Sequence, residues 1–315
     1  MLYGAFQKTV QTVIVLLIVS VASFGFLKLA PGDPVMAVMD EEFDQETYDR
    51  LFHEMGLDRP AVEQFGTWLI DFVSLDWGHS YISRVDIFQL AIVEALPVTL
   101  SLAAYSLIFS LGIGIPLGVL GAVRQNSVWD VFATSWALTG VAFPSFYLGL
   151  ILIWVFAVEL NWFPSMGFVP PWEDFWGGIW HLTMPAFTLS TFYMGLITRV
   201  TRASLVEVLG QPYILAARAR GEPGWKIVWV HAMRNVMMPV VTIIGLQLGG
   251  LLQGAVLTES VFTLPGLGQM IVSSVLNREY TVVQAGIMVT GVMFIAVNLI
   301  VDATYSYLDP RLRKS

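Results

Sequence analysis

The sequence contains no cysteine and few charged residues. Without cysteine, the chain has neither disulfides nor thiolate metal ligands. Charged residues make up 13% of the chain, against roughly 25% in a typical soluble domain. Hydrophobic residues make up 56%. This composition excludes an ordinary soluble protein and predicts an all-α integral membrane protein with several membrane-spanning helices.

The sequence also lacks the motifs of common enzymes. It has no GxxxxGK[ST] phosphate loop, no HExxH zinc motif and no recognisable pairing of a nucleophile with a base. His53 and His79 do not stand in a metal-ligand spacing, so solvated or hydrogen-bonded histidines are the simpler interpretation. We therefore expect neither catalysis nor a metal or cofactor held by this chain.

The net charge of −8 comes from one segment. Residues 31–96 hold 14 acidic side chains against three arginines, and an acidic chain is not expected to bind nucleic acid. Two amphipathic helices are predicted in this segment, at Asp40–Arg50 and Ala61–Val73, with a turn at Gly56–Pro60 and a loop at Asp76–Ser80. The segment is either part of a docking or packing surface or a solvated acidic face.

Apolar runs separated by polar or turn residues predict six membrane-spanning helices. The first run is longer than the apolar core of a secretory signal, so we interpret it as a retained helix. Pro144 should either kink the third span or mark a shift in its packing, and the aromatic loop Asn161–Trp180 suits a membrane interface. The predicted spans are Val10–Leu29, Pro97–Val123, Val128–Leu160, Leu182–Thr198, Val236–Val256 and Val282–Tyr305.

Lysine and arginine positions predict the orientation. We place the chain in a cell (inner or plasma) membrane with both termini in the cytoplasm. In this orientation 11 of the 16 basic residues lie on the cytoplasmic side: Lys8, Arg124, Arg199, Arg202, Arg218, Arg220, Lys226, Arg234, Arg311, Arg313 and Lys314. The predicted regions are a first helix with its cytoplasmic amino terminus at 1–30, an external acidic segment at 31–96, a five-helix membrane domain at 97–308, and a cytoplasmic tail at 309–315.

The stretch Gly210–Pro239 is then cytoplasmic and unusually polar for this chain. Pro212 suits the first position of a helix, Gly221 suits its end, and Glu222-Pro-Gly224 turns the chain into a second helical run at Trp225–Asn235. The small side chains of the first helix permit close approach of another surface. The stretch is either an ordinary loop between spans or a docking element for a separate ATPase.

The span centres offer little that would drive transport from within. Asp130, Glu207, Glu259 and Asp302 lie near span ends, whereas an ion-coupled carrier normally needs a buried carboxylate or a broken helix at mid-depth. The mid-span polar residues Gln247 and Asn298 either make interhelical hydrogen bonds or contact a transported molecule. If the energy for transport comes from a separate protein, the cytoplasmic stretch is the natural docking element for that protein.

Ordered motifs along nearly the whole chain resemble the permease subunits of binding-protein-dependent ABC importers for dipeptides and oligopeptides, with nickel and glutathione importers as relatives. Each motif is short, but their order is specific. They are Pro31–Pro34, Gly56–Pro60, Asp76–Ser80, Leu96–Leu100, Phe143–Phe146, Tyr213–Gly221, His231–Asn235, Pro239–Thr242, Glu259–Phe262, Pro265–Gly268, Asn298 with Asp302, and Asp309–Arg311.

The resemblance implies a type I importer permease whose loop 210–235 carries an EAA-like coupling motif seated in a groove of the ATPase. Leu215 stands where the general motif has Glu, and Arg234 where it has Pro, a variation that favours the peptide branch. The coupling residues implied are Tyr213, Ala216, Ala217, Arg218, Arg220, Gly221, Trp225, His231, Arg234 and Asn235, with Gln247 and Asn298 as candidates for the translocation pathway.

The implied activity is ATP-driven import of di- or oligopeptides delivered by an external solute-binding protein. A second homologous permease and two ABC ATPase subunits would complete the complex in the lipid membrane, and ATP and Mg²⁺ would bind the ATPases. The same machinery for nickel or glutathione stays open, because substrate selection in such systems lies mainly in the binding protein. An ion-coupled secondary transporter and a membrane scaffold are the alternatives from other classes.

Overall fold

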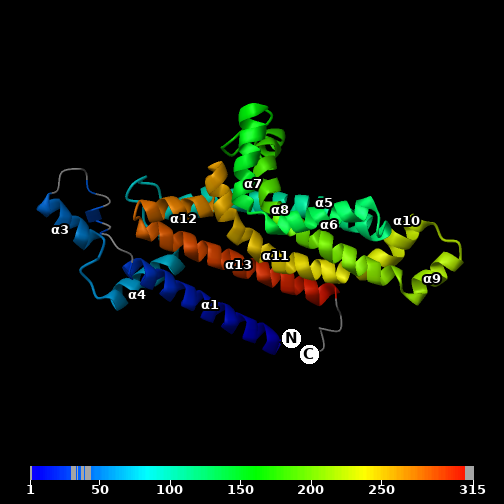
Figure 1. Ribbon diagram of the computed structural model, residues 1–315. Helices are drawn as coiled ribbons and strands as arrows, with labels where there is room; N and C mark the ends of the chain where they lie inside the picture. Colours follow the sequence, from blue (N-terminus) through cyan, green and yellow to red (C-terminus); the bar gives the residue numbers. More distant parts are fainter. Residues whose placement is uncertain (1, 30–32, 34, 37–38, 40–43, 309–315) are drawn as a thin grey trace. The chain divides into compact units, whose positions relative to one another are not determined.

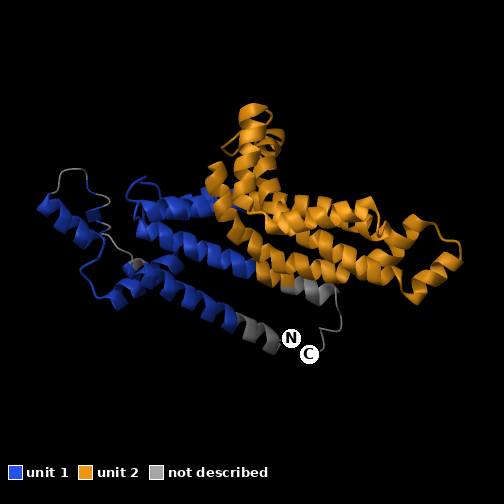
Figure 2. Ribbon diagram, viewed as in Figure 1, with its two compact units in different colours: residues 1–99, 265–296 blue, residues 100–264, 297–315 orange. Residues whose placement is uncertain are grey.

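The computed structural model describes residues 2–29, 33, 35–36, 39 and 44–308. Apart from one isolated bridge between His79 and Asp86, these residues form helices, turns and loops (Figure 1). The chain divides into two compact units, each described here by itself (Figure 2). Unit 1 comprises residues 1–99 and 265–296, and unit 2 comprises residues 100–264 and 297–315. Two of the three boundaries fall within helices α5 (Leu96–Val123) and α13 (Tyr280–Leu308), and the third falls between residues 264 and 265, in a loop.

Unit 1 begins with helix α1 (Leu2–Leu29) and two shorter helices, α3 (Gln45–Glu54) and α4 (Ala61–Ser74). The second predicted amphipathic helix, Ala61–Val73, is therefore confirmed to within one residue. The first predicted amphipathic helix, Asp40–Arg50, corresponds to α3 and starts later than predicted. The Asp44 side chain caps α3 by accepting hydrogen bonds from the backbone N–H groups of Glu46 and Thr47. Residues 40–43 of the predicted helix lie outside the described residues.

Aromatic stacking orders the loop that follows α4. The Trp77 ring lies 4.8 Å from Phe72, centroid to centroid, and its Nε1 donates to the Phe72 carbonyl oxygen at 2.9 Å. Further along, a π-helical turn η1 (Gln89–Ala95) leads into α5. Thr99 Oγ1 accepts a hydrogen bond of 2.9 Å from the backbone N–H of Leu267 at the start of α12 (Leu267–Leu276). Unit 1 thus joins segments that are far apart in the sequence.

Unit 2 is built around the long helix α8 (Phe175–Leu209), which packs against α6 (Val128–Ala142), α7 (Ser145–Leu152) and α11 (Met233–Phe262). Several of its buried hydroxyl groups donate to its own backbone; Thr188 Oγ1, for example, donates to the Met184 carbonyl oxygen at 2.8 Å. This satisfies polar groups in an apolar environment without a partner helix. Polar residues are therefore compatible with a central position for α8.

Glycines allow α5 and α8 to approach closely within unit 2. A Cβ added at Gly118 would lie 2.6 Å from Thr201 Cβ and 2.7 Å from the Thr198 carbonyl oxygen. The Thr198 hydroxyl donates to the Gly114 carbonyl oxygen at 3.2 Å across the same contact. Small residues at a helix crossing, supported by interhelical hydrogen bonds, are the usual means of packing membrane helices.

Helices α6 and α7 meet at a sharp break. They are bent by 104° at Phe143-Pro144, after which the chain continues through a π-helical turn, η2 (Ile153–Glu159). Pro144 starts the second helix because its fixed φ and missing N–H prevent continuation of the first. The prediction that Pro144 kinks this segment is confirmed; the uninterrupted run Val128–Leu160 is a broken pair of helices.

Each of the six predicted spans lies in a helix or in this broken pair. Among the described residues, three helical runs are long and apolar enough to cross a membrane, with the broken pair as a possible fourth. The described apolar part of α1, Val10–Phe26, is shorter, and α8 is long but more polar. The three runs are Gln89–Val123, Gly224–Phe262 and Tyr280–Val301.

Two predicted boundaries were wrong. The aromatic loop ends at Asp174, not Trp180, because the Asp174 carboxylate caps α8 by accepting the Gly177 N–H at 3.0 Å. The predicted helix Trp225–Asn235 is not separate from the fifth span. Instead α10 (Gly224–Lys226), the π-helical turn η3 (Ile227–Ala232) and α11 form one continuous helical run, since no breaker stands between them.

Candidate functional site

The stretch that the sequence predicts to face the cytoplasm and to couple the chain to an ATPase forms a short helix, α9 (Pro212–Ala219), followed by a tight turn. Pro212 occupies the first turn of the helix, as predicted, and Gly221 has a φ of +77°, a conformation that favours glycine. Ile214 and Ala217 are buried in an apolar cluster formed with α5, α8, η3 and α11. Packing within unit 2 therefore holds one side of α9 in place.

The opposite side of α9 and the start of the next helix are exposed. Large apolar side chains lie there: Leu215 is 54% exposed, Trp225 66% and Trp229 52%. Such exposed side chains on a rigidly held helix are the expected property of a partner-binding surface. Ala216, Arg218 and Arg234 are exposed as well, whereas Ala217 is buried and can act only through packing inside this chain.

Glu222, which the sequence predicts only as part of a turn, holds this region together. Its Oε1 accepts a hydrogen bond of 2.9 Å from Arg220 Nη2, and its Oε2 lies 2.7 Å from His231 Nε2 and 3.2 Å from Lys226 Nζ. The hydrogen bonds from His231 and Arg220, with Lys226 adding to them, lower the pKa of Glu222 to about 2. The turn is therefore tied to η3 by a charged cluster.

A signal for this cluster was present in the sequence. Glu222 lies four residues before Lys226, the spacing at which opposite charges meet on a helix. His231 lies nine residues away, so its contact depends on the turn and was not predictable from spacing alone. Glu222 thus supplies a carboxylate to a loop that has Leu215 where the general coupling motif has Glu.

A second tie fixes the beginning of α9. The Asn235 Nδ2 donates to the Tyr213 hydroxyl oxygen at 2.7 Å, bringing together two of the predicted coupling residues from positions 22 apart in the sequence. Of the other predicted coupling residues, Arg220, Gly221 and His231 belong to the Glu222 turn. The structure thus gathers the predicted set into one surface element with an internal polar framework.

The two candidates for the translocation pathway occupy different environments in unit 2. Gln247 on α11 is 5% exposed, and within the described part of the chain neither atom of its side-chain amide has a hydrogen-bond partner. Asn298 on α13 is half-buried. The structure gives no hydrogen bond between them. An unpaired buried amide is costly, which keeps Gln247 a candidate for contact with a molecule not present here.

An ion pair fixes the start of α6 against α8. Asp130, which is 5% exposed, accepts from Arg202 Nη2 at 2.8 Å through one oxygen and from Arg202 Nε through the other. This two-point contact has the fixed geometry of an arginine–carboxylate pair. Asp130 is therefore engaged structurally and is not a free carboxylate for ion coupling.

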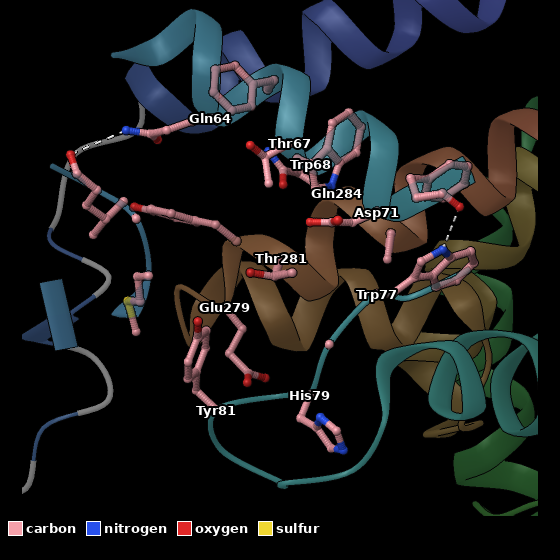
Figure 3. Close-up of a pocket in the computed structure, with 18 of the residues that line it drawn as sticks. Gln64, Thr67, Trp68, Asp71, Trp77, His79, Tyr81, Glu279, Thr281 and Gln284 are labelled. Carbon is pink, nitrogen blue, oxygen red and sulfur yellow. Dashed lines mark hydrogen bonds between the residues drawn. The ribbon is translucent and has the colours of Figure 1, made fainter. Parts of the chain in front are cut away.

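Unit 1 contains a cavity of about 500 Å³ (Figure 3). Its wall comes from the end of α1, the turn at 55–59, α4, the loop at 76–81 and the start of α13. Aromatic rings form much of the wall, and burial, with the nearby charge of Glu54, raises the pKa of the Tyr81 hydroxyl. No local sequence pattern predicts this cavity, because its walls come from segments that are far apart in the chain.

Glu279 joins two of these segments. Its Oε1 accepts hydrogen bonds from Ser80 Oγ at 2.7 Å and from the backbone N–H of Ile82 at 3.0 Å. Ser80 and Glu279 are both more than nine-tenths buried. The loop after α4 and the loop before α13 therefore meet, which requires both to lie on the same side of a membrane.

The fold and its surfaces define a helical membrane protein with an exposed element suited to binding a partner. Two family models match the chain. Residues 114–314 match the binding-protein-dependent transport system inner membrane component, and residues 1–103 match the N-terminal part of such membrane components. The chain belongs to this family of inner-membrane transport components. It is a transport permease of an ABC importer rather than an enzyme, and it works with a separate ATPase and a binding protein.

Relatives match over almost the full chain. The dipeptide transport system permease protein DppB of Escherichia coli (strain K12) is 38% identical over 319 residues, covering 94% of each chain. The protein of the same name from Alkalihalophilus pseudofirmus is 34% identical over 333 residues, covering 99% of this chain and all of that one. A solved inward-facing structure of the MetNI methionine ABC transporter has a TM-score of 0.55 at 20% identity, covering 67% of this chain and 93% of that one. This likeness confirms the type I permease fold.

Proposed function

We propose that this permease subunit forms the translocation pathway for di- or oligopeptides that an external solute-binding protein delivers. The observation that carries the peptide assignment is the 38% identity, over 94% of both chains, to a permease named for dipeptide transport. Nickel and glutathione remain alternatives within the same machinery.

We further propose the assembly and the orientation. Two ABC ATPase subunits and a second, homologous permease complete the complex, with both termini in the cytoplasm and segment 31–96 outside. The hydrogen bonds between Glu279 and the loop at residues 80–82 support this topology, because six spans would place both segments on one side.

In the proposed mechanism α9 transmits ATPase movement to the spans. ATP binding closes the ATPase pair, and the surface around Ala216, Arg218 and Trp225 moves with it. The buried contacts of Ile214 and Ala217 pass this displacement into α5, α8 and α11. The ATPase shifts the permease between its two states only through contacts that differ between them.

The test is replacement of Gly221 by valine. A β-branched side chain at a φ of +77° is strained and should alter the turn after α9. We expect membrane insertion to persist while ATPase copurification and peptide uptake fall at least about tenfold, the equivalent of roughly 1.4 kcal/mol of lost coupling.

The matched control is Gly112→Val in α5, where nothing lies within 4 Å of an added Cβ. This variant should retain ATPase binding and uptake. Normal uptake and ATPase binding in the Gly221→Val protein would contradict the coupling role of this turn.

A further inference from the structure

The cavity of unit 1 holds polar side chains that have no partner. Gln284 is 8% exposed and lines the cavity, and among the described residues it makes no hydrogen bond. The Tyr280 hydroxyl oxygen is buried without a hydrogen-bond partner. Asp71 and Thr281, which lie on facing helices in Figure 3, also have side chains with no hydrogen bond or ion pair within the described part of the chain. The Tyr280 hydroxyl is a buried polar group of the kind that normally has a partner, and the half-buried Asp71 and Thr281 and the Gln284 amide present further free polar atoms to the same cavity. This convergence indicates a site that an external molecule completes.

The charges that line the cavity are not equivalent. Glu279 is already occupied by the Ser80 hydroxyl and the Ile82 N–H, and Arg59 Nη1 lies 3.7 Å from Glu63 Oε1. Lys28 lies over the Phe24 ring, 5.8 Å from its centroid. Asp76 and Arg278 also line the cavity, but both are exposed. Asp71 is half-buried, has no ion pair within the described part of the chain, and faces the unpaired hydroxyl and amide groups. The position of Asp71 therefore favours a cationic ligand that also donates hydrogen bonds to a few neutral acceptors.

The aromatic residues beside Asp71 favour the same class of ligand. The Trp68 and Phe72 rings are 6.0 Å apart, and Phe72 stacks on Trp77 at 4.8 Å, so they form a continuous aromatic wall. The face of an aromatic ring attracts a cation, most strongly when the cation is partly desolvated. A carboxylate next to such a wall, with hydroxyl and amide oxygens nearby, matches a primary ammonium group, which has three donors and no acceptor.

We propose that this cavity binds the free α-ammonium group of a peptide or amino acid, with Asp71 as its counter-ion, Gln284 and Thr281 as acceptors, and Trp68 and Phe72 as its aromatic wall. The choice between peptide and amino acid rests on the proposed transport function. The cavity would then form a recognition point on the proposed external side, in addition to the pathway within the spans.

The first experiment uses the unaltered full chain in nanodiscs. Binding of radiolabelled dialanine, alanine and N-acetyl-dialanine is compared, because acetylation removes the positive charge and leaves the rest of the dipeptide. We expect dialanine to bind at least about tenfold more tightly than its acetylated form, because the acetylated form lacks the charged donor that pairs with Asp71. Tighter binding of dialanine than of alanine identifies the peptide as the source of the ammonium group; the reverse identifies the amino acid.

The second experiment locates the site. Asp71→Asn keeps the size of the side chain and removes its charge, and Gln284→Met removes the amide. Both should weaken dialanine binding at least about tenfold, while Glu46→Gln, which changes an exposed carboxylate on α3 outside the cavity wall, should bind as the unaltered chain does. Thermal unfolding in the nanodisc confirms that each variant is folded.

Equal binding of free and acetylated dialanine, or no binding of either, overturns the inference, and so does unchanged binding by a folded Asp71→Asn protein. Uptake of dialanine by the complete complex is measured separately. Uptake without ammonium-selective binding would remove this site and leave the proposed function intact, whereas binding without any uptake by the unaltered complex would count against the proposed function.

Discussion

At the scale of single residues, Glu222 shows how one carboxylate stabilises a surface turn. Three basic side chains from positions 220, 226 and 231 meet it, and this arrangement lowers its pKa from 4.5 to about 2. A carboxyl whose pKa is lower in the folded state stabilises that state above its ordinary pKa, and the contribution disappears as the pH falls through the folded value. The turn is therefore a pH-sensitive element only under acid conditions.

We expect the backbone amides of α9 to lose protection from hydrogen exchange between about pH 4.5 and pH 2, after correction for the intrinsic rate. Glu222→Gln should lower protection already at pH 7 and remove most of this pH dependence. Glu207→Gln, which changes an exposed carboxylate on α8, should behave like the unaltered chain. Identical exchange in the Glu222→Gln and unaltered proteins at pH 7 would refute the stabilising role of the cluster.

At the scale of helices, the crossing of α5 and α8 depends on the absence of side-chain atoms at Gly118. The backbone carbonyl of Thr198 is one of the atoms that a methyl group would meet, and a backbone atom moves less easily than a side chain. Overpacking of this kind typically costs about 1–3 kcal/mol. The crossing is therefore sensitive to a single added carbon.

We expect Gly118→Ala to lower the unfolding temperature of the detergent-solubilised chain, with a loss of stability of about 1–3 kcal/mol. Gly112→Ala in the same helix should be neutral or slightly stabilising, because its surroundings are open and alanine favours helix. Equal unfolding temperatures for the two variants would show that α5 and α8 can separate at this point without cost.

The contrast between helices and contacts explains what the sequence could and could not predict. Apolar periodicity located a helix in each predicted span and the start of α4, and Pro144 located the break between α6 and α7. The sequence does not predict that residues 225–235 join the fifth span in one helical run, because the polar composition of this stretch indicates the end of a span. The Glu222 cluster and the cavity around Asp71 depend on folding of distant segments, and no local pattern encodes such contacts.

At the scale of the whole molecule, the chain depends on a separate ATPase subunit. Asp130 is bound to Arg202, and GxxxxGK[ST] is absent from the sequence. The membership of an importer family assigns ATP hydrolysis to a separate subunit. Transport is accordingly a property of the complex rather than of this chain.

We expect proteoliposomes with this chain alone to show no uptake of dialanine, with or without ATP or an ion gradient. Addition of the cognate ATPase, the partner permease and the binding protein should give uptake that requires ATP. The ion-coupled alternative predicts gradient-driven uptake by the chain alone and its loss in Asp302→Asn; that result would overturn the ABC mechanism.

The hydrogen bonds of Glu279 to Ser80 and Ile82 also set an order of assembly. Ser80 and Glu279 are separated by 199 positions, and residues 100–264, which belong to unit 2, are synthesised between them. During translation the loop around Ser80 emerges long before its partner. Unit 1 can therefore be completed only after residues 100–264 have been synthesised, and a ribosome that stops before Glu279 leaves a buried polar pair unmade.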